Sequence, residues 1–269
     1  MRMDTKELYL EIPQGQIYVK RWIVDQKNSF KNAPIILFHE SLGSVELWRD
    51  FPEQLALATQ RDVIAYDRIG FGKPSVQVHS LELNFIEQEV QDTFSFLFDA
   101  LGIKKFVAMG HSVGGGMAAV CAALYPFNCV ALITESAQAM VEDVTLEGIR
   151  KAKVNFKNEK FFNRLAKYHA DKTQWVLDAW TETWLNPAFA AWCLDRYLAQ
   201  VCCPVLSIHG EQDEYATLAQ PQRFVERVQG PAELCIIPEC QHFPHQEKPE
   251  QVLQVIKQFL TNIKIKKGA

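Results

Sequence analysis

Short apolar runs alternate with longer amphipathic segments along most of the chain. Several of the runs are apolar at every position, which is typical of a strand buried on both faces of a sheet. The predicted strands are residues 7–12, 16–23, 34–38, 63–66, 105–109, 130–134, 204–209 and 234–237. The first two are separated by Pro-Gln-Gly at 13–15, which has the composition of a hairpin turn.

The segment from Leu83 to Leu101 has a different period. Its apolar residues recur three and four positions apart, and Gly102 follows as a stop, so it predicts an amphipathic helix. Further helices are predicted at 117–125, 218–228 and 249–263. Because strands that alternate with helices through tight connections run parallel, with right-handed crossovers, the pattern indicates an α/β fold.

The alternation stops near Ala137 and resumes after Gln200. The intervening segment has helical periodicity, no predicted strand and many aromatic residues: Phe156, Phe161, Phe162, Tyr168, Trp175, Trp180, Trp184, Phe189, Trp192 and Tyr197. We therefore predict an α/β core made of residues 1–136 and 201–269, interrupted by a helical insertion at 137–200.

Composition places the chain among ordinary globular proteins. It has 269 residues, 48% of them hydrophobic, and a formal net charge of -4, which gives no reason to expect a nucleic-acid partner. Charged residues interrupt the first ten positions, and no apolar run approaches the ~20 residues that cross a bilayer, so we expect no signal peptide and no membrane partner. Seven irregularly spaced cysteines indicate reduced, mostly buried thiols and a cytoplasmic protein.

A candidate nucleophile lies directly after the predicted strand 105–109. Residues 110–114 read Gly-His-Ser-Val-Gly and fit the pattern G-x-S-x-G, in which a sharp strand-to-helix turn exposes a serine, here Ser112. The pattern is short enough to arise by chance, and it could mark a packing turn with an idle serine. A buried strand before it and a small-residue helix after it favour the catalytic interpretation.

A serine hydroxyl needs a base to remove its proton. Asp213 and His242 each follow a predicted strand, so both should reach the sheet edge where Ser112 lies, in the order Ser, Asp, His. His242 would act as general base and then general acid, while Asp213 would orient it and stabilise the imidazolium. Glu211 and Glu214 flank Asp213 and are alternative acids.

Other histidines lie near these positions. His245 is one turn from His242, and the two could suggest a metal pair, but no further ligands are apparent in the sequence, so we expect no metal. His209 at a strand end and His111 beside the nucleophile are expected to be structural. An oxyanion hole requires two backbone N–H groups, and one should belong to Val113, the residue after the nucleophile.

Five stretches together resemble the α/β-hydrolase superfamily. They are FHESLGSVELW at 38–48, YDRIGFGKPS at 66–75, GHSVGG at 110–115, HGEQDE at 209–214 and CQHFPHQEKPEQV at 240–252. The resemblance implies a mostly parallel eight-stranded sheet with helices on both faces, a helical cap at 137–200, and Ser41 as the second oxyanion N–H. Glu40 stands where the family usually has glycine; our hypothesis is that it points away from the site and holds the loop by hydrogen bonding.

The cap is basic. Between Thr145 and Lys172 it has eight basic and three acidic side chains, in a chain of net negative charge. Such a run is usually a solvated helix face, but it could also dock an acidic partner. The arrangement resembles that of esterases that cleave pimeloyl-acyl-carrier-protein methyl ester, which implies acyl carrier protein as a partner. The candidate docking residues are Arg150, Lys151, Lys153, Lys157, Lys160 and Arg164.

The leading prediction is a serine hydrolase that cleaves a carboxylic ester through an acyl-enzyme on Ser112, with no cofactor. Serine rather than aspartate at position 112 argues against a haloalkane dehalogenase or an epoxide hydrolase, which the resemblance would otherwise include. A carbon–carbon bond hydrolase of ring-cleavage products and a cofactor-free perhydrolase use the same triad and remain alternatives. From a different class, the chain could be a ligand-binding module with a vestigial triad.

Overall fold

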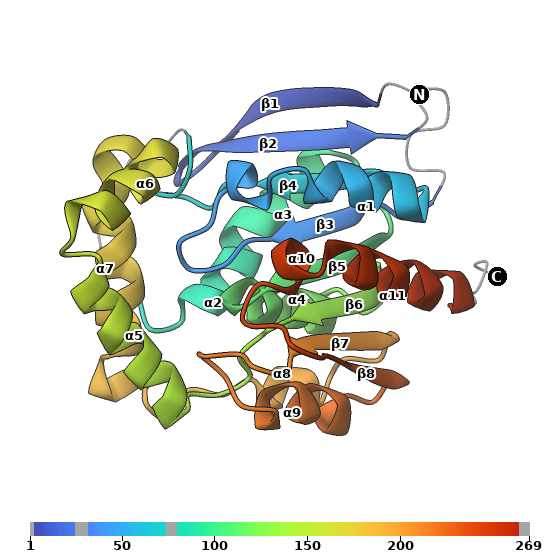
Figure 1. Cartoon of the computed structure of the whole chain (residues 1–269). Helices are drawn as coiled ribbons and strands as arrows, with labels where there is room; N and C mark the ends of the chain where they lie inside the picture. The colour runs from blue at the N-terminus through green and yellow to red at the C-terminus, as the bar shows by residue number, and fades with distance from the viewer. Residues whose placement is uncertain (1–2, 25–31, 74–79, 264–269) are drawn as a thin grey trace.

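A single twisted sheet of eight strands forms the centre of the protein (Figure 1). The computed structural model describes residues 3–24, 32–73 and 80–263. The strand order is β1-β2-β4-β3-β5-β6-β7-β8; β1 and β2 pair antiparallel, β2 pairs antiparallel with β4, and all later pairs are parallel. The strands are Asp4–Ile12, Gly15–Ile23, Ile35–Phe38, Val63–Tyr66, Phe106–His111, Cys129–Glu135, Val205–Gly210 and Ala232–Ile237.

Helices cover both faces of the sheet, as the sequence predicts. On one face pack α1 (Phe51–Thr59) and α11 (Pro249–Asn262), which Figure 1 shows lying along the strands. The other core cluster joins the opposite face to α2 (Phe85–Gln88), α4 (Val113–Leu124), α8 (Asp195–Leu198) and α9 (Ala219–Arg227). The short α10 (Pro244–Glu247) precedes α11. Each predicted strand is confirmed to within a few residues. The central strands β3, β4, β5 and β7 are buried at every position, which explains their continuous apolar runs.

The predicted helix at 83–101 is only partly correct. Leu83 lies outside it and is exposed, and the helix begins at Phe85. It then widens into a π-helical segment, Glu89–Phe94, before α3 (Ser95–Ala100). The buried Glu89 carboxylate accepts a hydrogen bond from the Tyr66 hydroxyl at 2.8 Å, a polar contact inside an otherwise apolar face. The stop is confirmed: Gly102 has a φ of +62°, a conformation that favours glycine.

The segment between β6 and β7 is helical. It forms α5 (Asp143–Asn155), α6 (Glu159–His169) and α7 (Thr173–Trp184), which stand together beyond one end of the sheet in Figure 1, and then α8. A single bridge between Met140 and Cys193 joins its two ends. The division into core and cap at 137 and 200 stays a prediction, and we use the word cap for α5 to α7.

Two further expectations concern compartment. All seven cysteines are free thiols, but the expectation that most are buried is wrong, since only Cys121, Cys129 and Cys240 are. Across the described residues, every helix is too short or too polar to span a bilayer. A cytoplasmic location stays a prediction.

In the stretch 66–75, the final Pro74 and Ser75 lie outside the described residues.

Candidate active site

Ser112 lies at the turn between β5 and α4. Its φ of 55° and ψ of -127° are rare for a residue with a side chain, so the turn is strained. Close approach of the backbones explains the flanking glycines: a Cβ at Gly110 would lie 2.0 Å from the carbonyl oxygen of Gly114, and one at Gly114 would lie 2.1 Å from that of Phe38. The strand, turn and helix therefore present the Ser112 side chain in the way expected of a G-x-S-x-G elbow.

Asp213 and His242 reach the same edge of the sheet from the loops after β7 and β8. The Nδ1 atom of His242 lies 2.9 and 2.8 Å from the two carboxylate oxygens of Asp213. Burial lowers the pKa of His242, but the hydrogen bond and charge of Asp213 outweigh burial and raise that pKa above its ordinary value. Burial likewise opposes a charged Asp213, yet His242 holds the pKa of this carboxyl below its ordinary value.

Neither alternative acid takes this position. Glu211 accepts a hydrogen bond from the backbone N–H of Glu239 at 3.2 Å. Glu214 is exposed. The carboxylate that contacts His242 therefore belongs to Asp213, which is also fixed by a 2.8 Å hydrogen bond from the backbone N–H of Tyr215.

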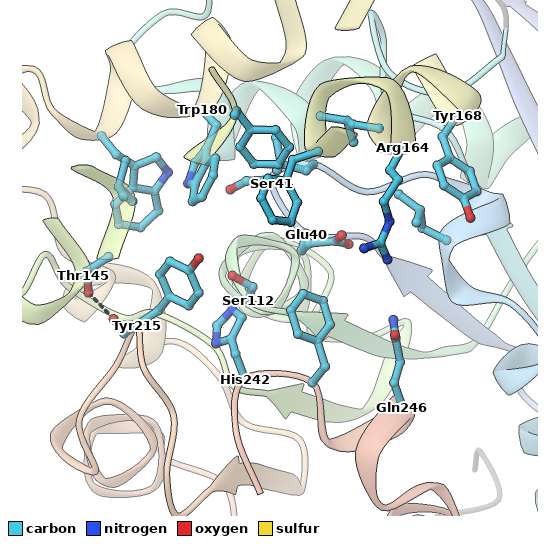
Figure 2. Close-up of a pocket in the computed structure, with 18 of the residues that line it drawn as sticks. Glu40, Ser41, Ser112, Thr145, Arg164, Tyr168, Trp180, Tyr215, His242 and Gln246 are labelled. Atoms are coloured by element: carbon cyan, nitrogen blue, oxygen red, sulfur yellow. Dashed lines mark hydrogen bonds between the residues drawn. The ribbon is translucent and has the colours of Figure 1, made fainter. Parts of the chain in front are cut away.

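The Ser112 hydroxyl donates a hydrogen bond to Oε1 of Gln138 at 3.2 Å. Figure 2 shows the imidazole of His242 beside Ser112, although no hydrogen bond joins the two side chains in the described part of the chain. A contact between nucleophile and base commonly tightens only when substrate is present. Gln138, which follows β6 and is buried, was not identified from the sequence because no motif marks it.

A buried polar network ties the nucleophile turn to the loop that carries His242. The imidazole of His111, next to Ser112, donates from Nε2 to the carbonyl oxygen of His242 at 2.8 Å. Glu135, at the end of β6, accepts the backbone N–H of Ser112 on its carbonyl at 2.9 Å. Its carboxylate binds His245. Burial opposes the charge on Glu135, but His245 holds the pKa of this carboxyl below its ordinary value.

Among the described residues, ligand atoms of His111, Glu135 and His245 lie within 4.8 Å of one another. This group does not contain His242, so it is not the pair considered from the sequence. Nε2 of His111 and Nδ1 of His245 make hydrogen bonds within the protein, while Nδ1 of His111 and Oε2 of Glu135 have no partner in the described part of the chain. The bonds that join the nucleophile turn to the loop of His242 are structural, in agreement with the role expected for His111.

The loop after β3 supplies the other predicted oxyanion group. Ser41 lines the same cavity as Ser112. Among the described residues, neither the Ser41 N–H nor the Val113 N–H donates to a protein acceptor. Both are thus available to a ligand oxygen.

Histidine and arginine side chains hold this loop in place. Arg68 donates from Nη2 to the carbonyl oxygen of Glu40 at 2.9 Å, and Nδ1 of His39 donates to the same oxygen at 2.8 Å. His169, the last residue of α6, donates from Nε2 to the carbonyl oxygen of Leu42 at 2.8 Å. The cap therefore contributes directly to the position of the loop.

The hypothesis that Glu40 points away from the site is wrong. Its side chain lines the cavity, and Figure 2 shows it on the same side of the site as Arg164. Arg68 and His39 hold the loop through the backbone carbonyl of Glu40, while the Glu40 carboxyl accepts a hydrogen bond from its own backbone N–H. Burial raises the pKa of Glu40, so this position adds a proton-binding group beside the nucleophile.

Ser112 and His242 open into a cavity of about 470 Å³ between the core and the cap. Of the aromatic residues that the sequence places in the insertion, Trp180 and Trp184 line the cavity, whereas Phe189 and Trp192 do not. Phe189 stacks on Trp192 at 5.3 Å between ring centroids and belongs to the core. The volume is sufficient for a small organic substrate.

The candidate docking residues do not form one uniform surface. Arg150 and Lys151 pair with Glu147, and Lys153 pairs with Glu182. Lys157 and Lys160 are exposed. Arg164 lines the cavity.

Comparison with known sequences identifies the family. Residues 33–172, more than half of the chain, match the family described as alpha/beta hydrolase fold. The chain belongs to the α/β-hydrolase family. This membership confirms the predicted fold class and supports a hydrolase.

Two relatives and one solved structure illustrate the range of the family. Serine hydrolase BPHL from Homo sapiens is 27% identical over 235 residues, covering 84% of this chain and 78% of that protein. The 1-acylglycerol-3-phosphate O-acyltransferase ABHD5 from Sus scrofa is 30% identical over 116 residues, covering 42% of this chain and only 32% of that protein. A 2-hydroxy-6-oxo-6-phenylhexa-2,4-dienoate hydrolase from Rhodococcus sp. strain RHA1 has a TM-score of 0.74 at 17% identity, over 97% of this chain and 100% of that one.

Proposed function

We propose that this α/β-hydrolase cleaves a carboxylic ester through an acyl-enzyme on Ser112. The observation that carries the proposal is the arrangement of three side chains: a strained serine facing a cavity, a histidine beside it, and a buried aspartate bound to Nδ1 of that histidine. Asp213 keeps the proton of His242 on Nδ1, which leaves Nε2 to accept the proton of Ser112.

The reaction then follows from the geometry. Ser112 attacks the ester carbonyl, and the negative oxygen that develops is stabilised by the free N–H groups of Ser41 and Val113. His242 returns its proton to the departing alcohol. A water molecule, deprotonated by His242, then releases the acid from Ser112.

Labelling with a fluorophosphonate tests the nucleophile, because the probe reacts with an activated serine. We expect one equivalent of label on the wild-type protein, none on Ser112→Ala, and unchanged labelling of the matched variant Ser80→Ala, whose serine is exposed and away from the cavity. Turnover of p-nitrophenyl esters of graded acyl length should depend on the same residue. A folded wild-type protein that takes no label would favour the binding-module alternative.

A carbon–carbon bond hydrolase is the second candidate, since the chemistry can use the same three side chains and the Rhodococcus enzyme shares the fold. A cofactor-free perhydrolase is a third. Direct assay with a coloured dienoate substrate, and with acetate and hydrogen peroxide, separates them from an esterase. Higher kcat/KM for the dienoate than for every ester in the panel would replace the ester proposal.

We also propose that the exposed basic residues of the cap dock an acyl carrier protein. Lys157 and Lys160 support this, because neither forms an ion pair in the described part of the chain. Reversing both charges should lower kcat/KM for a carrier-linked methyl ester more than for the free ester. Lys257→Glu on α11 is the control, and equal effects of the two changes would contradict docking.

A further inference from the structure

Three basic side chains line the cavity: Arg164 and Lys167 from α6 of the cap, and Arg49 from the core, just before α1. Within the described residues, none of the three forms an ion pair or a side-chain hydrogen bond. By contrast, Lys153 on α5 pairs with Glu182, and Arg196 on α8 pairs with Glu87. The cavity therefore has positive charge that the protein itself leaves without a partner.

The placement of these cations follows from their elements. Phe161, Arg164, Leu165 and Tyr168 recur three and four positions apart on α6, so one face of this helix forms the cavity wall. Arg164 and Lys167 are three positions apart on this face, a spacing at which like charges repel weakly, and both are partly exposed to solvent. Arg49, from the core, follows Trp48 in a backbone conformation with a φ of 54°, and strain of this kind concentrates at functional sites.

The other side of the cavity is apolar. Ile149 from α5 and Trp180 and Trp184 from α7 form it, together with Tyr215. Figure 2 shows Ser112 between these two sides, with Trp180 and Tyr215 on one and Arg164 and Gln246 on the other. The described lining has a single carboxyl, Glu40, whose pKa burial raises, so the basic side keeps an excess of positive charge.

We propose that the substrate carries an anionic group, a carboxylate or a phosphate, that binds Arg164 with Arg49 and Lys167 nearby, while its apolar part lies against Trp180 and Trp184. The inference rests on the proposed ester hydrolysis and names the class of ester. A guanidinium can bind either anion through two parallel hydrogen bonds, and Gln246 provides a further polar group at the same side.

Matched ester pairs test the proposal. The first pair is the monomethyl ester of a dicarboxylic acid and the methyl ester of the monocarboxylic acid with the same number of carbons. We expect the wild-type protein to prefer the charged ester in kcat/KM, and Arg164→Gln to reduce that preference by about tenfold, since a contact to a charged group contributes ~1.5 kcal/mol. Arg227→Gln, at an exposed position on α9, should keep the wild-type preference.

A second substrate identifies whether the bound anion is a carboxylate or a phosphate. A methyl ester linked to the detached phosphopantetheine arm, without the carrier protein, has a phosphate and no free carboxylate on the acyl chain. If Arg164→Gln lowers kcat/KM only for the free monomethyl ester, the anion is a carboxylate; if only for the arm-linked ester, it is the phosphate. Either result supports the proposal.

Two outcomes separate this inference from the proposed function. If the wild-type protein has equal kcat/KM for neutral and charged esters, and if neither Arg164→Gln nor Arg49→Gln changes the ratio of these two values, the anion site is overturned while the esterase stands. If Ser112 takes no fluorophosphonate and no ester is hydrolysed, the proposed function itself fails.

Discussion

Glu135 accepts two hydrogen bonds from His245, one from the backbone N–H and one from Nδ1, each at 2.7 Å. The same residue accepts the backbone N–H of Ser112 on its carbonyl oxygen. Because His245 is three residues after His242, Glu135 fixes the distance between the nucleophile turn and the loop of the base. Its side chain does so from a fully buried position at the end of a central strand.

Replacing Glu135 with glutamine should therefore destabilise the protein. The change removes the charge that faces His245 and places an amide N–H₂ group where Oε2 of Glu135 has no hydrogen-bond partner among the described residues, for which we expect a loss of about 3 kcal/mol in the free energy of unfolding. Urea denaturation measures it, with Glu233→Gln on the exposed face of β8 as the control. Equal stability of the two variants would show that the charge of Glu135 does not stabilise this loop.

Asp213→Asn should lower kcat by about three to four orders of magnitude, because asparagine no longer selects the tautomer in which His242 accepts a proton. The carboxylate of Asp213 also raises the pKa of His242. His242 must be neutral to act as a base, so the acid limb of the kcat/KM profile should move to lower pH in the variant. Glu226→Gln, exposed on α9 and not among the charges that act on His242, should leave both quantities near the wild-type values.

The sequence was sufficient to predict the sheet and the three residues at its edge. Strands buried on both faces are visible as apolar runs, and the carboxyl ends of parallel strands meet, so Ser112, Asp213 and His242 could be placed together from local patterns alone. Gln138 and Glu135 could not. Each is a single polar residue in or beside an apolar strand, and its partner is defined only by tertiary packing.

The sequence also could not predict the direction in which side chains point. Glu40 was expected to face away, and the candidate docking residues were treated as one surface. Which way a residue such as Arg164 faces depends on how α6 packs against the loop after β3, through contacts like that of His169 with Leu42. No pattern within either segment encodes that contact.

His169 should make the folded protein sensitive to acid. It is fully buried, donates to Leu42 and accepts the backbone N–H of Gly72 on Nδ1 at 3.0 Å, so it must be neutral. Burial lowers its pKa to about 4, against about 6.5 in an unfolded chain. Between these values the unfolded state binds more protons, so stability falls as the pH decreases from 6.5 to 4.

The variant His169→Gln isolates this effect, because glutamine can still donate to Leu42 but does not titrate. Between pH 7 and pH 4 the wild-type protein should lose about 3 kcal/mol more unfolding free energy than the variant. Urea denaturation at a series of pH values measures the difference. If unfolding free energy depends on pH in the same way for both proteins, protonating His169 does not disturb its contacts with Leu42 and Gly72.

Glu40→Gln tests whether the carboxyl beside the nucleophile acts on the base. Burial lowers the pKa of His242 while Asp213 raises it most, and the charge of Glu40 contributes in the same direction as Asp213. Removing that charge should lower the pKa of His242 and move the acid limb of kcat/KM to lower pH. The shape of the loop should persist, because the contacts from Arg68 and His39 are made to the Glu40 carbonyl, which the substitution keeps. Glu53→Gln, on the exposed side of α1, serves as the control. If the pH profiles of the wild-type protein and Glu40→Gln coincide while stability changes, Glu40 has a packing role and its carboxyl does not influence His242.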